Sequence, residues 1–167
     1  MAWTTPKTWA AADVVTAALL NAHIRDNLNI IAAVGINGWT DYSASATWTG
    51  SGSNPTYTVN YAKYCQVGKW VSYRAKYTCT TAGTGTYGWS IPVTARTFAG
   101  ALSVGYGTVY DASGTDTWHF ILDHGGGSAA LRGLWDAQTA AGVVTQTSPF
   151  TFAVSDIVTF QVDYEAA

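Results

Sequence analysis

Few side chains in this sequence combine the residue types and the spacing that chemistry requires. The nearest approach to a cluster is His119, Asp123 and His124, which offer imidazole and carboxylate groups that zinc accepts as ligands. In an extended strand, residues 119 and 123 share a face while residue 124 points to the other side. The spacing also matches no common zinc pattern. We therefore expect no metal site in this segment.

Two further segments resemble parts of functional motifs without completing them. Residues 111–116, "DASGTD", offer oxygen ligands for calcium but lack the acidic residues that follow in an EF-hand loop. Residues 124–128, "HGGGS", resemble the glycine-rich oxyanion segment of esterases, but the chain has no Gly-x-Ser-x-Gly elbow. Because Asp, Ser and Gly are also the usual residues of turns, we interpret both segments as turns or loops.

The carboxylates do not suit glycoside hydrolysis, which needs two of them on facing elements. The chain has one glutamate, Glu165, and most of its aspartates stand at expected turns. It also has no glycine-rich phosphate loop. We therefore expect a protein that is not an enzyme, with no catalytic residues and no cofactor.

Aromatic residues are the stronger candidates for binding, since the chain has eight Trp, ten Tyr and five Phe. Exposed Trp and Tyr rings can stack on sugar faces, which would suit a polar β-sandwich that binds carbohydrate. The alternative is that these rings fill the core or a subunit interface, where aromatic residues dominate the packing. Both interpretations apply to Trp70, Trp89, Trp118 and Trp135, and no glycan-contact residue is identified.

The composition favours a rigid extracellular or particle-bound β protein. Apolar residues make up 48% of the 167 residues, so a packed core is expected. Charged residues make up only 11%, against roughly 25% in typical soluble domains. The net charge of −2 and the scattered Lys and Arg residues argue against nucleic-acid binding and against attraction to an anionic membrane.

Neither a signal peptide nor a membrane span is expected. The early residues include Trp3, Pro6, Lys7 and Trp9, and no apolar region follows them. No stretch approaches the roughly 18 apolar residues of a membrane span. We expect a protein that is made in a cytoplasm and reaches the outside by lysis or as cargo.

The two cysteines are expected to be small buried thiols rather than a disulfide. The sequence predicts a hairpin that turns at Gly68 and Lys69, with Gly supplying the positive φ of a two-residue turn. In that register Cys65 faces Ser72 and lies roughly 20 Å along the ribbon from Cys79. A disulfide needs Cα atoms within about 7 Å.

The elements that position these residues begin with one helix, predicted over residues 14–31. Apolar Leu20, Ile24, Leu28 and Ile31 follow one another at intervals that place them on a single stripe of the helix. Polar residues cover most of the remaining helix surface. A helix of this length is marginal in water, so the stripe must find a partner.

The ends and the partner of this helix leave alternatives open. Thr16 or Asp13 can cap the N-terminus, and Gly35 is the expected residue just after the C-terminus. The stripe could lie on the chain's own β domain. Alternatively, it could pair with copies of itself or dock on a larger assembly, which we favour because the connector after the helix can hold it away from the domain.

From Trp39 onward the apolar pattern changes to alternation, as in residues 71–79 and 156–166, which predicts half-buried antiparallel strands. Turn residues separate these segments. The sequence therefore predicts a mainly β fold, an antiparallel jelly-roll-like β-sandwich preceded by one short N-terminal α-helix. Residues 1–35 are the expected anchor segment and helix, and residues 36–167 the β-sandwich domain. Further strands are expected at 39–49, 55–61, 86–91, 100–110, 116–123, 129–135 and 149–153.

Three segments of the chain resemble a known class of proteins. Residues 5–28, "TPKTWAAADVVTAALLNAHIRDNL", are similar to the N-terminus of small tail, fibre-like and head-decoration proteins of tailed bacteriophages, especially those that infect actinobacteria. Residues 148–167, "SPFTFAVSDIVTFQVDYEAA", resemble their closing strand pair. Residues 61–93, "YAKYCQVGKWVSYRAKYTCTTAGTGTYGWSIPV", look like the pattern of their trimeric jelly rolls.

The resemblance implies a structural protein of the virion surface, either a minor tail or fibre-like protein or a capsid decoration protein. It also implies a homotrimer whose N-terminal segment attaches to capsid or tail proteins. Host surface carbohydrate is a further expected partner, in a role of host adhesion. The alternative is a stand-alone carbohydrate-binding β-sandwich module.

The residues themselves suggest how such a protein would assemble. Three helices could bury Leu20, Ile24, Leu28 and Ile31 against each other, and β-branched Ile in the stripe is compatible with a trimer. The aromatic rings of Trp3 and Trp9 could insert into a pocket on the particle as anchors.

Overall fold

The computed structural model describes residues 5, 7–29, 38–97, 100–125, 130–137 and 140–167. The chain divides into two compact units, Met1–Trp39 and Thr40–Ala167, and each is treated by itself. The expected boundary between residues 35 and 36 lies outside the described residues, as does the expected helix end at Gly35. In the described part, no helix is long and apolar enough to cross a membrane.

The N-terminal unit contains one helix in three consecutive parts. It begins as α1 (Ala17–Leu20), widens into the π-helical η1 (Asn21–Arg25) and returns to α-helix at residues 26–29. Thr16 caps it, because its Oγ1 accepts a hydrogen bond from the Leu19 N–H at 3.3 Å. The alternative cap, Asp13, instead accepts from the Ala10 N–H.

The π turn changes how the apolar residues line up along the helix. In a regular α-helix, residues four apart drift by about 40° around the axis, because each turn holds 3.6 residues. In η1 the Asp26 N–H donates to the Asn21 carbonyl, five residues back, so this turn holds more residues. The angle between Leu20 and Ile24 around the axis therefore differs from that in a regular α-helix.

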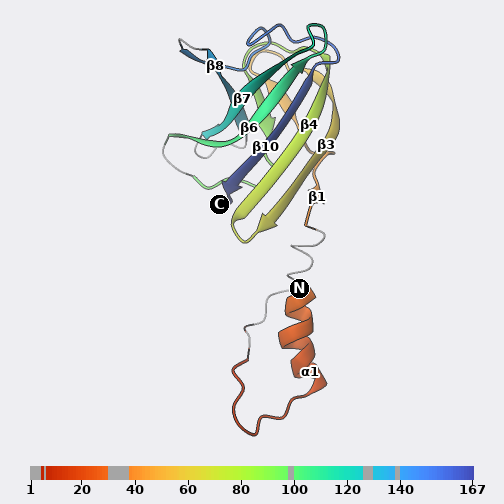
Figure 1. Cartoon of the computed structure of the whole chain (residues 1–167), viewed down its shortest axis with the longest axis vertical. Coiled ribbons are helices and arrows are strands. Elements are labelled where there is room, and N and C mark those ends of the chain that lie inside the picture. The colour runs from red at the N-terminus through yellow and green to blue at the C-terminus, as the bar shows by residue number, and fades with distance from the viewer. Residues whose placement is uncertain (1–4, 6, 30–37, 98–99, 126–129, 138–139) are drawn as a thin grey trace. The chain divides into compact units, whose positions relative to one another are not determined.

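The C-terminal unit is an antiparallel β domain, in which the described strands form a curled sheet of order β1-β3-β4-β10-β6-β7-β8-β5-β2, with β9 paired to β8 (Figure 1). This sandwich-like, mainly β fold behind one short helix confirms the predicted fold class. The strands are β1 (Thr40–Asp41), β2 (Trp48–Gly50), β3 (Thr56–Val67), β4 (Trp70–Thr81), β5 (Tyr87–Ser90), β6 (Ala101–Asp111), β7 (Asp116–Gly125), β8 (Ala130–Ala137), β9 (Ala140–Val143) and β10 (Ile157–Glu165).

The β3–β4 hairpin has the register that the sequence predicts. Gly68 adopts φ +60°, and the first strand pair beyond the turn is Val67 with Trp70. Cys65 accordingly pairs with Ser72, and no disulfide joins it to Cys79. Further along β3 the pairing shifts between Val59 and Tyr61, which leaves Asn60 as an extra residue in this strand.

The core lies on the concave face of the curled sheet and is rich in aromatic rings. Trp48 and Trp89 come from the neighbouring strands β2 and β5, and both are fully enclosed. Trp89 stacks on Phe120 of β7 with a centroid distance of 5.6 Å, and Trp48 meets the edge of Tyr77 at 6.2 Å. Such ring pairs add to the stability that area burial alone provides.

Two expected strands are not present as predicted. The segment 39–49 is split into β1 and β2, because the Asp41 carboxylate accepts from the Ser43 N–H and starts a turn. Residues 149–153 form no strand, since Pro149 has no N–H for a ladder and Phe152 turns into the core against Tyr87.

Candidate functional site

The predicted apolar stripe of the helix is exposed, as are Val14 and Val15 just before the helix. Leu20, Ile24 and Leu28 are 42%, 50% and 57% exposed. The fourth expected member, Ile31, lies outside the described residues. In a single copy of the chain, three large apolar side chains on one line of the helix thus remain in contact with water.

The helix is covered on the face that carries His23 and Asn27. Asn27 is only 5% exposed, and its Nδ2 donates to the His23 carbonyl at 3.2 Å. The side chain of His23 is half-buried on the same side of the helix. An ordinary surface helix buries its apolar stripe. Here the stripe is exposed, and so are the polar residues Asn21, Arg25 and Asn29.

Of the two predicted attachment residues, Trp3 and Trp9, the structure describes only Trp9. Trp9 is exposed, and the Lys7 ammonium lies 4.7 Å from the centroid of its ring in a cation–π contact. Lys7 also pairs with Asp13 at 3.1 Å, which ties this turn together. Trp3 lies outside the described residues. Trp9 is therefore an accessible aromatic ring just before the helix.

A second exposed feature lies on the convex face of the β domain. Tyr106, in the central strand β6, is 70% exposed and stands directly between Gln161 of β10 and Ile121 of β7. The same row continues through Arg74 of β4 on one side and Leu134 of β8 on the other. The strand register thus places the Tyr106 ring in the middle of this row. Polar Gln161 and Arg74 lie on one side of it, and apolar Ile121 and Leu134 lie on the other.

Shallow hollows lie on both sides of the Tyr106 ring. One, of about 270 Å³, is lined by Arg74, Gln161 and the hydroxyl-bearing Thr108 and Thr159. The other, of about 230 Å³, is lined by His119, Ile121 and Leu134. Tyr106 and Gly107 contribute to both hollows.

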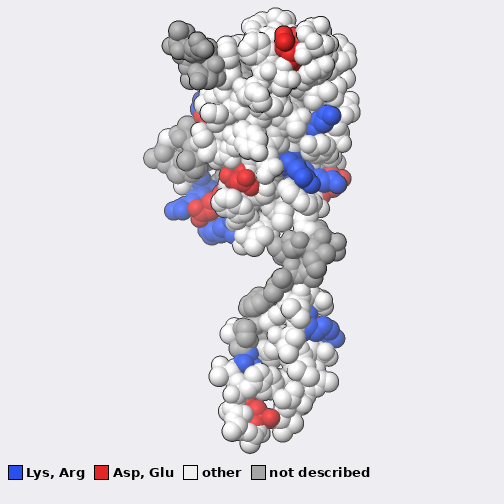
Figure 2. Space-filling model, viewed as in Figure 1, with Lys and Arg blue, Asp and Glu red and all other residues white. Residues whose placement is uncertain are grey.

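Charge on this convex face is concentrated on β3 and β4. Lys63 and Arg74 pair directly across these strands, and Lys76 follows on the same face of β4. Asp41 of β1 pairs with Lys63, and the carboxylate of Asp163 belongs to the neighbouring strand β10. Figure 2 shows a further group of basic and acidic residues at the lower left of the β domain and an acidic group near its top.

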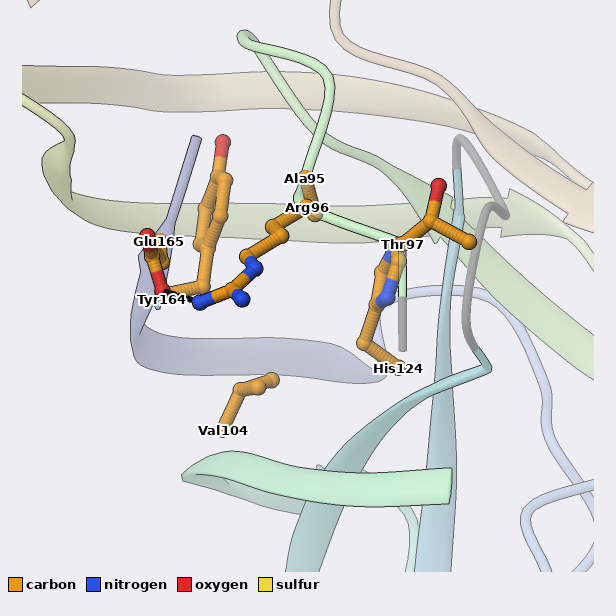
Figure 3. Close-up of a pocket in the computed structure, with 7 residues that line it drawn as sticks. All are labelled: Ala95, Arg96, Thr97, Val104, His124, Tyr164 and Glu165. Atoms are coloured by element: carbon orange, nitrogen blue, oxygen red, sulfur yellow. Dashed lines mark hydrogen bonds and ion pairs between the residues drawn. The ribbon is translucent and has the colours of Figure 1, made fainter. Parts of the chain in front are cut away.

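A cavity of about 470 Å³ lies beside the C-terminal end of β10 (Figure 3). Tyr164 and Val104 form its apolar walls, and His124 and Thr97 face each other on one side. Arg96 reaches across it to Glu165, with Nη1 and Oε2 2.9 Å apart.

The polar groups of this cavity are used to hold the strand ends together. The Arg96 N–H donates to the Glu165 carbonyl, and the Tyr164 hydroxyl donates to the Val93 carbonyl at 2.9 Å. Burial of its ring raises the pKa of Tyr164 to about 12, so this hydroxyl stays protonated at neutral pH. The cavity is therefore a gap in the packing, and the polar groups of Arg96, Tyr164 and Glu165 at its border already have partners within the protein.

The sheet separates His124 from His119 and Asp123, the other two residues that the sequence offers as metal ligands. His119 is exposed, whereas Asp123 and His124 are buried on opposite faces of β7. Arg132 of β8 holds both carboxylate oxygens of Asp123. Within the described parts of the chain, no group of three His, Cys, Asp or Glu side chains could hold a metal ion.

The segment 111–116 forms the expected turn. The Asp111 carboxylate accepts from the N–H groups of Ser113 and Gly114, at 2.8 and 3.0 Å, and from the Ser113 hydroxyl. The hydrogen bond from Gly114, followed by those from Ser113, lowers the pKa of Asp111. This carboxylate is therefore engaged by its own turn. Of "HGGGS", His124 is a buried residue of β7 and residues 126–128 lie outside the described residues.

The structure separates the four tryptophans that the sequence treats alike. Trp89 is a core residue, and Trp135 is half-buried with its ring 6.3 Å from that of Trp118. Trp70 and Trp118 are exposed in the single chain. The exposed ring with hollows on both sides, Tyr106, was not singled out by the sequence, although its position between Gly105 and Gly107 is a readable signal.

Comparisons with protein-family models, with curated protein sequences and with solved structures find no match for this chain.

Proposed function

We propose that this chain is a structural protein of the bacteriophage virion surface, which assembles as a homotrimer and attaches to the particle through its N-terminal segment. The observation that carries the proposal is the exposure of the apolar stripe of the helix. Leu20, Ile24 and Leu28 are left in water, although the face that carries Asn27 is covered.

An exposed stripe of this kind calls for a partner. Fully burying one Leu or Ile side chain contributes about 1.5–3 kcal/mol relative to leaving it in water. Three such side chains on each copy supply enough free energy to hold a small helical assembly together. A helix of this length gains little stability by itself, so the stripe and its partner stabilise the helix as well.

Copies of the same chain are the simplest partner, because each copy brings an identical apolar stripe. β-branched Ile24 near the middle of the stripe is compatible with three strands. The resemblance of residues 5–28 to virion proteins of tailed phages supports the same oligomeric state.

Attachment to the particle is assigned to the segment before the helix. The Trp9 ring is exposed and its position is fixed by the Lys7 contact, so it can fill a pocket on a capsid or tail protein at small entropic cost. Both a minor tail or fibre-like role and a capsid decoration role use this arrangement. The β domain then forms the outward part.

Light scattering on the full chain tests the assembly. We expect a mass of three times the 17.7 kDa of one chain. Ile24→Asp places a charge in the stripe and should reduce the mass to that of a single chain. Asn29→Asp is the matched control, because Asn29 is an exposed polar residue of the same helix, outside the stripe, and its variant should remain trimeric.

The outcomes separate the parts of the proposal. A full chain of single-chain mass contradicts the homotrimer. A trimer that survives Ile24→Asp contradicts the role of the stripe and moves the interface to the β domain. Particle attachment is tested by immunogold labelling of phage particles with antibody against the β domain, which should be lost with Trp9→Ala and kept with Ile24→Val.

A further inference from the structure

We propose that the convex face of the sheet around Tyr106 is a carbohydrate-binding site, on which a sugar ring stacks against Tyr106 and an oligosaccharide extends into the two hollows beside it. The inference deepens the proposed function, on which it rests for its biological setting, by naming the site and class of the host-side partner. The site itself depends only on the β domain.

The first support is the unusual exposure of the ring. Tyr106 is 70% exposed in the middle of a sheet, between the strands β10 and β7, where side chains of neighbouring strands normally cover one another. Gly105 and Gly107 precede and follow it, and its cross-strand neighbours Gln161 and Ile121 are themselves exposed. The ring is therefore open to a flat ligand.

The second support is the chemistry of the two hollows. A sugar ring has C–H groups on its faces and hydroxyl groups around its rim. Aromatic rings suit the faces. The Arg74 guanidinium, the Gln161 amide and the hydroxyls of Thr108 and Thr159 supply donors and acceptors for the rim on one side, and the His119 imidazole does so on the other.

The size of the site also suits a chain of small rings. Each hollow, of about 270 or 230 Å³, is smaller than the roughly 300–1,000 Å³ that takes a drug-sized ligand. Because Tyr106 lines both, the two form one continuous site across β4, β10, β6 and β7. Three strand spacings correspond to about 14 Å, which is longer than one sugar ring.

The charges argue against another protein, including a second copy, as the occupant. Interface cores are depleted of charged residues. Here the charged Arg74 lines one hollow, and Lys63 and Lys76 lie beside it on β3 and β4, with Asp41 and Asp163 on the neighbouring strands. A hydrated oligosaccharide can lie beside these charged side chains, because it need not remove all the water around them. The Arg74 side chain can also donate to its hydroxyl groups.

The test uses the full chain and an array of bacterial and plant oligosaccharides, neutral and uronate-bearing. The oligosaccharide with the strongest signal is then titrated by calorimetry. Tyr106→Ala should weaken binding by roughly tenfold or more, as expected for loss of an aromatic anchor. Tyr106→Phe, which keeps the ring, should retain most of the affinity. Tyr110→Ala is the matched control, because Tyr110 is exposed on the same strand and lines neither hollow.

Three results would overturn the inference. The first is an array on which no oligosaccharide binds, and the second is an affinity that Tyr106→Ala leaves unchanged. The third is a fall in the mass of the Tyr106→Ala variant in light scattering, which would make this face a contact between copies. The failures of the two proposals remain distinguishable. A single-chain protein that binds sugar through Tyr106 contradicts only the trimer, and a trimer without sugar binding contradicts only this site.

Discussion

Arg132 lies directly opposite Asp123 on neighbouring strands and holds both oxygens of a carboxylate that is only 2% exposed. The guanidinium itself is half exposed, so one partner of this ion pair remains in contact with water. The pair lies on the same face of β7 as Ile121, and it joins β7 to β8 beside the proposed sugar site.

Loss of Arg132 should therefore be costly for stability. Arg132→Ala leaves a buried carboxylate without its partner, and we expect a loss of about 3 kcal/mol in the free energy of unfolding. The measurement is urea denaturation. Arg96→Ala is the control, since the Arg96–Glu165 pair is exposed at both ends and its loss should cost less than about 1 kcal/mol. Equal losses in the two variants would contradict the distinction.

Buried tyrosines should make the fold sensitive to alkali. Burial, followed by the charge of Cys79, raises the pKa of Tyr87 to about 12, and burial raises the pKa of Tyr73 and Tyr77 further. An unfolded chain releases these protons near pH 10. Stability from these groups is therefore complete below pH 10 and is lost as the pH rises towards 12, because the unfolded state then binds fewer protons.

Tyrosinate absorbance and near-ultraviolet circular dichroism, followed together, check this expectation. The buried tyrosines Tyr73, Tyr77 and Tyr87 should ionise only as the near-ultraviolet dichroism signal disappears. A smooth titration of every tyrosine near pH 10 in the folded protein would contradict the burial of Tyr73 and Tyr77.

The two thiols should react at different rates. Burial, with a smaller contribution from the charge of Asp156, raises the pKa of the Cys79 thiol, so little of the reactive thiolate is present at neutral pH. Cys65 is only half-buried. With Ellman's reagent, we expect one thiol to react in the folded protein and the second only in denaturant. A protein that shows no thiols until a reductant is added would contain the disulfide that the register excludes.

Gly105 should tolerate no side chain. A Cβ at this position would lie 2.1 Å from the Gln161 carbonyl oxygen and 2.7 Å from the Val162 Cα, both in the backbone of β10. Gly105→Ala should therefore cost more than about 3 kcal/mol, because β6 and β10 must separate. Gly68→Ala is the control: its Cβ would meet nothing within 4 Å, and only its positive φ should cost about 1 kcal/mol. Thermal unfolding compares the two.

Local sequence signals predict much of the fold. Thr16 is a correct helix cap, and the glycine at the tip of the β3–β4 hairpin determines the register of the strands on either side. Alternation correctly indicates β4 and β10 as half-buried strands. These features depend on residues close together in the chain, so a single sequence contains them.

Features that depend on distant residues were not predictable. Alternation places Asp123 on the solvent face of β7, and only the pairing with Arg132 explains its burial. Similarly, the exposure of Tyr106 depends on Gln161 of β10, more than fifty residues later, whose position follows from the sheet order. Local spacing predicts the apolar stripe of the helix but not the burial of Asn27 on another face.

The irregularity at Asn60 also has a consequence for crowded copies of this protein. β3 is a long strand near the end of the sheet, where only the two-residue β1 pairs with its outer side among the described strands. An uninterrupted strand of this length could recruit the same strand of a neighbour and start a fibre. The extra residue at Asn60 interrupts the regular ladder of the strand, which opposes such edge-to-edge joining between copies.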